Sequence, residues 1–274
     1  MKPFFSIVIP TLNEEKFLPK LLSDLVKQKE TNFEVIVAYG FSQDCTKDCI
    51  EPFKKTLNLQ FFQTKRKNVA AQRNYGATQS QGDYLVFLDA DTRVTPFFLK
   101  KVEKFVLKRK GLLFIPYSLP DKEYKQYKPL FDLGNILAEL SQKLPARFSL
   151  GGQIIIERGF FLLIKGFDEN LFISEDHELV QRAGQWGVES KFMKEAKTYF
   201  SLRRMKKQGQ IKFFYNYFIA TARRVFFNEE IKKRIFEYQM GGQVYEEEES
   251  HKKEEFFEHY FNQIKSLFKK ILTS

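Results

Sequence analysis

The sequence predicts an α/β fold, in which helices flank a mostly parallel sheet and a helical appendage follows at the C-terminal end. Short apolar runs alternate with amphipathic helical patterns through residues 1–120, as in proteins built from strand–helix–strand units. Hydrophobic residues make up 43% of the 274 residues and charged residues 29%, which is ordinary for a globular protein. The composition becomes basic and aromatic after residue 200. We therefore expect an α/β domain over residues 1–200 and the appendage over residues 201–274.

The first half of the domain is expected to contain four buried strands, because four apolar runs each end at turn residues. They span residues 6–10, 33–38, 59–62 and 84–88. A helix should follow the first strand, with Asn13 as its cap. Another should precede the fourth strand, and Pro96 should open a third.

The second half of the domain is less regular. Strands are expected at residues 112–117, 153–156 and 188–193. Two helices are expected, one over residues 127–144 and one that starts at Glu175 with Ser174 as its cap.

Several classes of protein do not fit the bulk sequence. The N-terminal apolar run is too short for a secretory signal, and no run of 18 apolar residues exists that would span a bilayer. Cys45 and Cys49 stand without a metal-ligand cluster, so two reduced thiols in a cytoplasmic protein are expected. The net charge of +11 suits an anionic partner, such as a phosphorylated ligand, a nucleic acid or a membrane surface, and a solvated basic surface equally well.

Asp89 and Asp91 stand two residues apart at the end of a predicted strand. Ligands of open α/β sheets bind at the carboxyl ends of the strands, so both carboxylates can reach one cleft. Hard oxygen ligands suit Mg²⁺ or Mn²⁺ held jointly with a diphosphate. Taken alone, the pair is also typical of aspartates that cap a turn.

Two other segments reach the same edge of the sheet. Thr11 and Glu14 follow the first strand, where they suit ribose or base hydroxyl groups. Arg73 lies on the helix before the Asp89 strand, where it can offset diphosphate charge or remain a solvated helix residue.

Glu175 and Asp176 form a third acidic cluster, at the start of a helix. Acidic residues in a first turn commonly complement the helix dipole. The chemical interpretation is that Asp176 takes a proton from an attacking hydroxyl group.

The chain resembles the family 2 glycosyltransferases, which have the Rossmann-like GT-A fold. The resemblance covers residues 4–200 and rests on six motifs in the family's order. They read SIVIPTLNEE, EVIVAYGFSQDCT, AAQRNYGA, GDYLVFLDADT, LGGQIIIERGFFLLIKGFDE and SEDHELVQRAGQWG.

The resemblance implies a role for each matching residue. The residues implied to contact the nucleotide sugar are Pro10, Thr11, Glu14, Tyr39, Arg73, Asp89, Gly151 and Gly152. It further implies that Asp91, with Asp89 beside it, coordinates a Mg²⁺ or Mn²⁺ ion bridging the phosphates. Asp176 would be the general base of an inverting transfer, and Glu175 would contact acceptor or donor.

The sequence departs from the family at Tyr39, where the second strand usually ends in an aspartate that reads the base. The uncharged phenol still forms hydrogen bonds, so a UDP-sugar remains the expected donor with its base in doubt. The segment from Gln181 to Trp186 echoes the QxxRW box of processive synthases, but it lies too close to Asp176 and lacks the arginine before the tryptophan. A processive polymer synthase is therefore not expected.

Two further interpretations compete with an active enzyme. A degenerate family member would bind a nucleotide sugar without catalysis, although Asp89, Asp91 and Asp176 are all present. Nucleic-acid binding would use the basic charge, but no nucleic-acid-binding motif supports it and we expect none.

Residues 203–224 combine basic and aromatic residues with no acidic ones. Such a segment suits peripheral contact with an anionic membrane at its inner face and a lipid-linked acceptor. The alternative is that its aromatic rings pack the appendage onto the catalytic domain.

Overall fold

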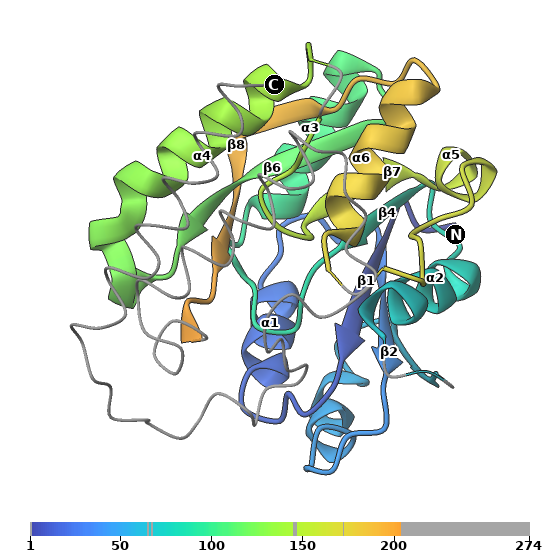
Figure 1. The fold of residues 1–274 in the computed structure, drawn as a ribbon. Coiled ribbons are helices and arrows are strands. Elements are labelled where there is room, and N and C mark those ends of the chain that lie inside the picture. The colour runs from blue at the N-terminus through green and yellow to red at the C-terminus, as the bar shows by residue number, and fades with distance from the viewer. Residues whose placement is uncertain (1, 65, 67, 145–146, 172, 204–274) are drawn as a thin grey trace, which may run out of the picture.

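The computed structural model describes residues 2–203 except 65, 67, 145, 146 and 172. These residues form one twisted sheet with helices on both faces (Figure 1). The α/β architecture agrees with the one predicted. The expected appendage, apart from its first three residues, lies outside the described part of the chain, so the division at residue 200 stays a prediction.

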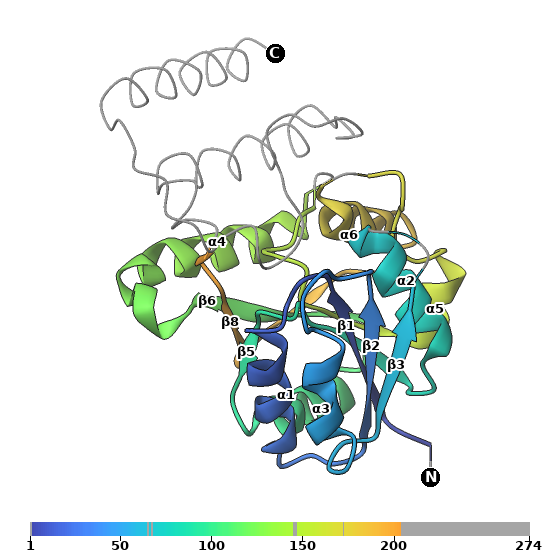
Figure 2. The same ribbon diagram turned by 90° about the horizontal axis from the view of Figure 1, so that it is seen from below.

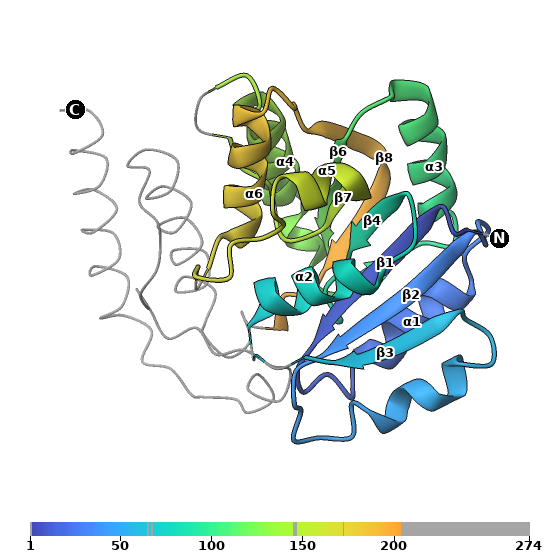
Figure 3. The ribbon, with the colours of Figure 1, turned by 90° about the vertical axis from the view of Figure 1, so that its right-hand side faces the viewer.

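The sheet of the described residues has eight strands in the order β3-β2-β1-β4-β7-β6-β8-β5. The strands are β1 (Phe5–Thr11), β2 (Phe33–Tyr39), β3 (Leu59–Gln63), β4 (Tyr84–Phe87), β5 (Arg93–Val94), β6 (Leu113–Pro120), β7 (Ile154–Glu157) and β8 (Lys191–Phe200). Strands β1 to β4 are parallel, and they lie side by side in Figure 3. Strand β7 runs antiparallel to both β4 and β6, and β5 runs antiparallel to β8. The sheet is therefore mostly parallel, as the sequence predicts.

The helices lie in two layers (Figure 2). The α-helices are α1 (Leu18–Val26), α2 (Val69–Gln79), α3 (Phe98–Arg109), α4 (Lys128–Ser141), α5 (Arg158–Leu163) and α6 (Glu175–Gln185). Two 3₁₀ helices, η1 (Asp48–Phe53) and η2 (Lys122–Tyr127), complete the described set. Helices α1 and α3 pack on one face of the sheet, and α2, α4, α5 and α6 pack on the other.

Each face of the sheet has its own apolar core, because alternate residues of a strand point to opposite faces. In β1, Ile7 and Ile9 join the core beneath α1 and α3, while Val8 joins the core beneath α2. All seven residues of β1 are buried, which explains why the strand reads as an uninterrupted apolar run. Because helices cover both faces of the sheet, the positions of the central strands are fixed, and so is the edge of the sheet at which these strands end.

One predicted helix cap is wrong, and the other is correct in position alone. Helix α1 begins at Leu18, and Asn13 instead has a φ of 55° and accepts a hydrogen bond from Gln43 N at 2.7 Å. Ser174 is the residue before α6, which begins at Glu175 as predicted, but its side chain makes no capping hydrogen bond. Its φ of 67° is also in the left-handed region.

None of the described helices is long and apolar enough to cross a membrane.

Candidate active site

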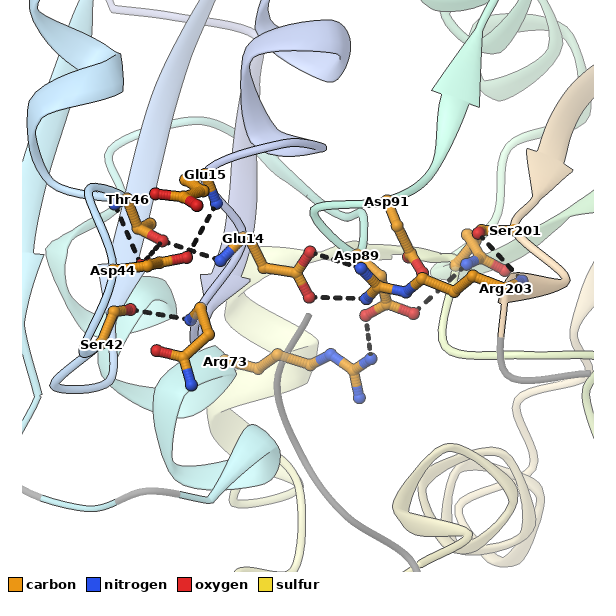
Figure 4. A network of polar contacts seen from close by, with 12 residues as sticks. Glu14, Glu15, Ser42, Asp44, Thr46, Arg73, Asp89, Asp91, Ser201 and Arg203 are labelled. Carbon is orange, nitrogen blue, oxygen red and sulfur yellow. Dashed lines mark hydrogen bonds and ion pairs between the residues drawn. The ribbon is translucent and has the colours of Figure 1, made fainter. Parts of the chain in front are cut away.

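The carboxyl ends of β1, β2 and β4 meet at one edge of the sheet, where they set out the predicted site residues. Thr11 pairs with Tyr39 at the last position of β1 and β2. Asp89 and Asp91 occupy the turn between β4 and β5, which a hydrogen bond from Thr92 N to Asp89 O closes at 2.9 Å. The predicted meeting of these segments is therefore present, and Figure 4 shows its acidic and basic side chains facing one another.

Arg73 of α2 links two of the acidic clusters. Its guanidinium donates from Nη2 to Asp89 Oδ1 at 2.7 Å and from Nη1 to Glu175 Oε1 at 2.6 Å. The side chain is only 3% exposed, and the Phe167 ring lies 5.3 Å from its Cζ. Burial lowers the pKa of Arg73, but Asp89 and Glu175 more than offset this and raise it above its ordinary value. Arg73 is thus a permanent positive charge between the carboxylates that the sequence placed in separate motifs.

Gly152 makes room for this arginine. A Cβ atom at Gly152 would lie 2.2 Å from Nη2 of Arg73, so any other residue there would force the guanidinium to move. The neighbouring Gly151 has a φ of +89°, a conformation that favours glycine. The sequence attributed this glycine pair to close approach of sugar and acceptor, whereas in the structure the group that approaches Gly152 is the Arg73 guanidinium.

Arg203, just beyond β8, forms a second basic centre. It donates to both carboxylate oxygens of Glu14, at 2.8 and 2.6 Å, and its Nε lies 3.0 Å from Asp91 Oδ2. The Phe17 ring stacks under its Cζ at 4.4 Å, and the side chain is 11% exposed. Bidentate arginine–carboxylate pairs are among the stronger polar contacts of proteins. Arg203 therefore faces the site, and the membrane contact predicted for residues 203–224 otherwise concerns residues outside the described part of the chain.

Asp176 lies in different surroundings from the other carboxylates. The Ser149 hydroxyl donates to its Oδ2 at 3.1 Å, and Nδ1 of His177 lies 3.5 Å from its Oδ1. Ser149 also lies 3.3 Å from that same nitrogen. Among the described residues, no arginine forms an ion pair with Asp176. Asp176 is buried and adjoins Glu175 in the chain. Burial raises the pKa of Glu175, Arg73 lowers it, and Asp176 raises it further, so that the net shift is upward.

Tyr39 keeps its ring inside the sheet edge. The residue is 8% exposed, its ring lies 5.0 Å from that of Phe61, and its hydroxyl donates to Ser42 O at 3.2 Å. The hydroxyl is thereby engaged with the loop after β2, which also holds Asn13 N through Ser42 Oγ at 2.8 Å.

Pro10 and Thr11 are buried behind the site. Thr11 accepts hydrogen bonds at its carbonyl from Gly40 N at 2.8 Å and from Gln72 Nε2 at 3.1 Å. These two hydrogen bonds hold the start of the loop that carries Glu14. The contact of Pro10 and Thr11 with a nucleotide stays a prediction.

The donor set at Asp89 and Asp91 fits a divalent cation shared with a phosphate ligand. Both residues offer hard carboxylate oxygens, and among the described residues no group of three acidic, histidine or cysteine side chains is arranged to hold a metal by itself. Mg²⁺ is commonly held by one or two carboxylates together with substrate phosphates, not by an all-protein cage. Asp89 and Asp91 would thus supply carboxylate ligands to a cation shared with a diphosphate.

Sequence reasoning missed four residues at this edge, namely Ser149, Gln153, His177 and Arg203. Gln153 Nε2 lies 3.4 Å from Asp89 Oδ2 and 3.3 Å from Thr92 Oγ1. Gln153 and His177 lie within motifs of the family resemblance and Ser149 directly precedes one, so position in or beside a motif was an available signal for all three. No spacing rule connects Arg203 to Glu14, from which it is separated by 189 positions.

A sequence model of the family described as glycosyl transferase family 2 matches residues 6–172. The chain belongs to this family. Among curated family relatives, the poly(ribitol-phosphate) β-N-acetylglucosaminyltransferase TarS of Staphylococcus aureus is 34% identical over 106 residues, 37% of this chain and 18% of TarS. An uncharacterized glycosyltransferase of Haemophilus influenzae is 27% identical over 248 residues, 80% of this chain and 95% of that protein. The chain thus spans less than a fifth of the length of TarS.

Solved structures of glycosyltransferases share the fold. TarS 1–349 of S. aureus in complex with UDP-GlcNAc is 22% identical with a TM-score of 0.61, over 81% of this chain and 66% of that one. The mannosyltransferase PcManGT from Pyrobaculum calidifontis, in complex with GDP-Man and Mn²⁺, is 18% identical with a TM-score of 0.62, over 80% of this chain and 65% of that one. The predicted family and its GT-A fold are both confirmed.

Proposed function

We propose that this protein is an inverting glycosyltransferase that moves a sugar from a nucleoside diphosphate to an acceptor hydroxyl group, with Asp176 as the general base. The observation that carries this proposal is the contrast in partners. Asp89, Asp91, Glu14 and Glu175 each form an ion pair with Arg73 or Arg203, whereas Asp176 contacts a serine hydroxyl and an imidazole. The oxygens of Asp176 are therefore not held in an arginine salt bridge among the described residues, which leaves them available to an acceptor hydroxyl group.

The reaction is a single displacement. The oxygen of the acceptor hydroxyl group attacks the anomeric carbon while Asp176 takes the proton of that hydroxyl group. At the same time the bond from the anomeric carbon to the diphosphate oxygen breaks. The electron pair of that bond leaves with the nucleoside diphosphate. Arg73 and Arg203 supply positive charge on the side of the site where this negative charge develops.

Asp89 and Asp91 would hold a Mg²⁺ or Mn²⁺ ion, which when bound neutralises charge on the leaving diphosphate. Mn²⁺ in the complex of PcManGT, a protein of the same fold, supports this assignment. Arg203 Nε lies 3.0 Å from Asp91 Oδ2. For a cation to bind Asp91, this distance must lengthen, or the carboxylate must contact the arginine and the cation together. Donor phosphate offers Arg203 a second anionic partner and would make that exchange possible.

A uridine diphosphate sugar is the proposed donor, supported by the UDP-GlcNAc complex of TarS. Tyr39 replaces the aspartate that the family uses to read the base, so we propose weak discrimination among bases. The acceptor is proposed to be lipid-linked, on the basic and aromatic character of residues 204–224, which lie outside the described part of the chain.

A thermal-shift series tests the proposal directly. UDP, GDP, dTDP and CMP are added with and without Mn²⁺, and the slow hydrolysis of each matching nucleotide sugar is then measured. Mn²⁺-dependent stabilisation by a nucleoside diphosphate, together with hydrolysis, is expected. Absence of stabilisation by every diphosphate would overturn the donor assignment.

The second candidate function is binding of a nucleotide sugar without catalysis. The contacts of Arg203 with Glu14 and Asp91 favour it, since they occupy two predicted donor ligands. Stabilisation by nucleotide with no hydrolysis and no transfer to any acceptor would favour this second function.

A further inference from the structure

Helix α4 has an apolar face that no described residue covers. Its inner face carries the buried residues Asn135, Ala138 and Ser141. Asn135 Nδ2 donates to Ser118 O at 2.8 Å, and its Oδ1 accepts from Ser118 N at 3.0 Å, which holds the helix on β6. The outer face of α4 carries five large aliphatic side chains, and Leu144 (56% exposed) follows three residues after the helix ends. The five are Leu130 (46% exposed), Leu133 (52%), Ile136 (48%), Leu137 (49%) and Leu140 (56%).

Five of these side chains recur in the pattern of a helix–helix seam. Residues 130, 133, 137, 140 and 144 are separated by three and four positions in alternation. Alternating spacings of three and four place side chains along one stripe of a helix, the pattern that another helix fills with its own side chains. We call residues 130, 133, 137, 140 and 144 the α4 stripe. An exposed aliphatic stripe of this regularity marks an interaction surface.

The C-terminal part of the same chain carries a matching stripe. Residues 257, 261, 264, 268 and 271 are separated by four and three positions in alternation. All five are large and apolar, and they read Phe257, Phe261, Ile264, Phe268 and Ile271. Both stripes have five members at the same period, so they can interdigitate over their whole length in either direction.

The described chain ends beside the start of α4. Leu202 is completely buried and packs with Tyr124, Tyr127 and Phe131, at the end of η2 and the first turn of α4. Residues 204–256 then connect this point to the C-terminal stripe. A helix of the length of α4 measures about 20 Å, so this connection reaches any part of it. A tethered segment also acts at a high effective concentration, which favours it over a separate partner.

We propose that the α4 stripe is the docking site of residues 257–271 of the same chain. The docked segment lies over the helix that supports the glycine loop of the site, since Gly134 of α4 packs against Leu150 at the entrance to Gly151. The C-terminal segment thus completes the outer layer of the catalytic domain.

Photo-crosslinking of the full chain tests this docking. Leu137 is replaced by p-benzoylphenylalanine, the protein is irradiated, and linked peptides are identified by mass spectrometry. The expected product is a crosslink within one chain to residues 251–274. The matched control places the same group at Leu107 of α3, which is 61% exposed on the opposite face of the sheet and should give no such product. Crosslinks between two chains, or none to residues 251–274, would overturn the proposal.

A charge variant gives an independent readout. In the Leu137→Lys/Leu140→Lys protein, amide hydrogen exchange in residues 251–274 is expected to accelerate at least about tenfold, since undocking removes protection. The Leu107→Lys protein should exchange there like the wild type. Unchanged exchange in the double variant would contradict the docking. The photo-crosslinking result stands by itself should the double variant fail to fold.

Discussion

The two sides of the site hold their carboxylates in opposite ways. On the donor side, Asp89, Asp91 and Glu14 are fixed by Arg73 and Arg203 at distances of 2.6 to 3.0 Å. On the side of Asp176, the direct polar contacts among the described residues are with Ser149 and His177, and Glu175 and Arg73 lie close enough to act on it electrostatically. Arginine retains its charge at every working pH, so in the proposed function the arginine-paired side would act electrostatically and Asp176 would transfer the proton. Residues of one type therefore serve two purposes, which their partners decide.

The largest expected effect comes from removing the proton acceptor. Asp176→Asn should lower kcat by about 10²–10⁴, because an amide cannot take the proton of the acceptor hydroxyl. Donor affinity, measured by titration of the nucleoside diphosphate, should stay nearly unchanged, because the arginine-paired side is intact. A variant that loses donor affinity but keeps kcat would place Asp176 with the donor ligands and remove the contrast.

The matched change on the donor side should have a different signature. Asp91→Asn is expected to lower turnover by about 10²–10³ and to abolish the dependence of nucleotide binding on Mn²⁺. Thermal shift with Mn²⁺ or EDTA measures the second effect and confirms that the fold is retained. More than about a tenth of wild-type activity would show that the metal assignment is wrong.

A smaller effect is expected from the base pocket. Tyr39→Asp should raise the preference for uridine nucleotides by about tenfold, since a carboxylate there restores the base-reading group of the family. Competition among UDP, GDP and dTDP measures the preference, with Tyr39→Phe as the control that removes only the hydroxyl. A wild-type protein that already prefers UDP about a hundredfold would contradict this expectation.

The smallest effect concerns pH. Burial raises the pKa of Glu175, and Asp89, Glu175 and Asp176 together outnumber the single Arg73 among them. A carboxyl whose pKa is raised by folding stabilises the protein in its protonated form, so this stabilisation is present at low pH and is lost as the pH rises through the raised pKa. The free energy of unfolding of the wild type, relative to Glu175→Gln, should therefore fall as the pH rises above the ordinary glutamate range. Urea denaturation of both proteins across that range measures it, and a difference that rises with pH would contradict the direction.

The local pattern was sufficient for the longer elements and for bringing most of the candidate site residues to one edge, but it did not predict the two-residue β5 or the short α5. The apolar runs predict β1, β2 and β4 because both faces of the sheet are covered, and strands that end together bring Glu14 and Asp89 to one edge. The caps were not predictable in the same way. Asn13 and Ser174 have the residue types of caps, but both have a positive φ, and Asn13 is held by contacts with the loop after β2, which have no sequence period.

The sequence by itself determined the family, the α/β order of elements and the carboxylates at the strand ends, since these depend on residue types at short, regular spacings. Only the tertiary structure decided which carboxylates are paired. Arg203 meets Glu14 from the far end of the described chain, and Ser149 meets Asp176 across 27 positions. Which side chains pair depends on how folding brings remote segments together. This pairing is what distinguishes the carboxylates held by Arg73 and Arg203 from Asp176, the proposed proton acceptor.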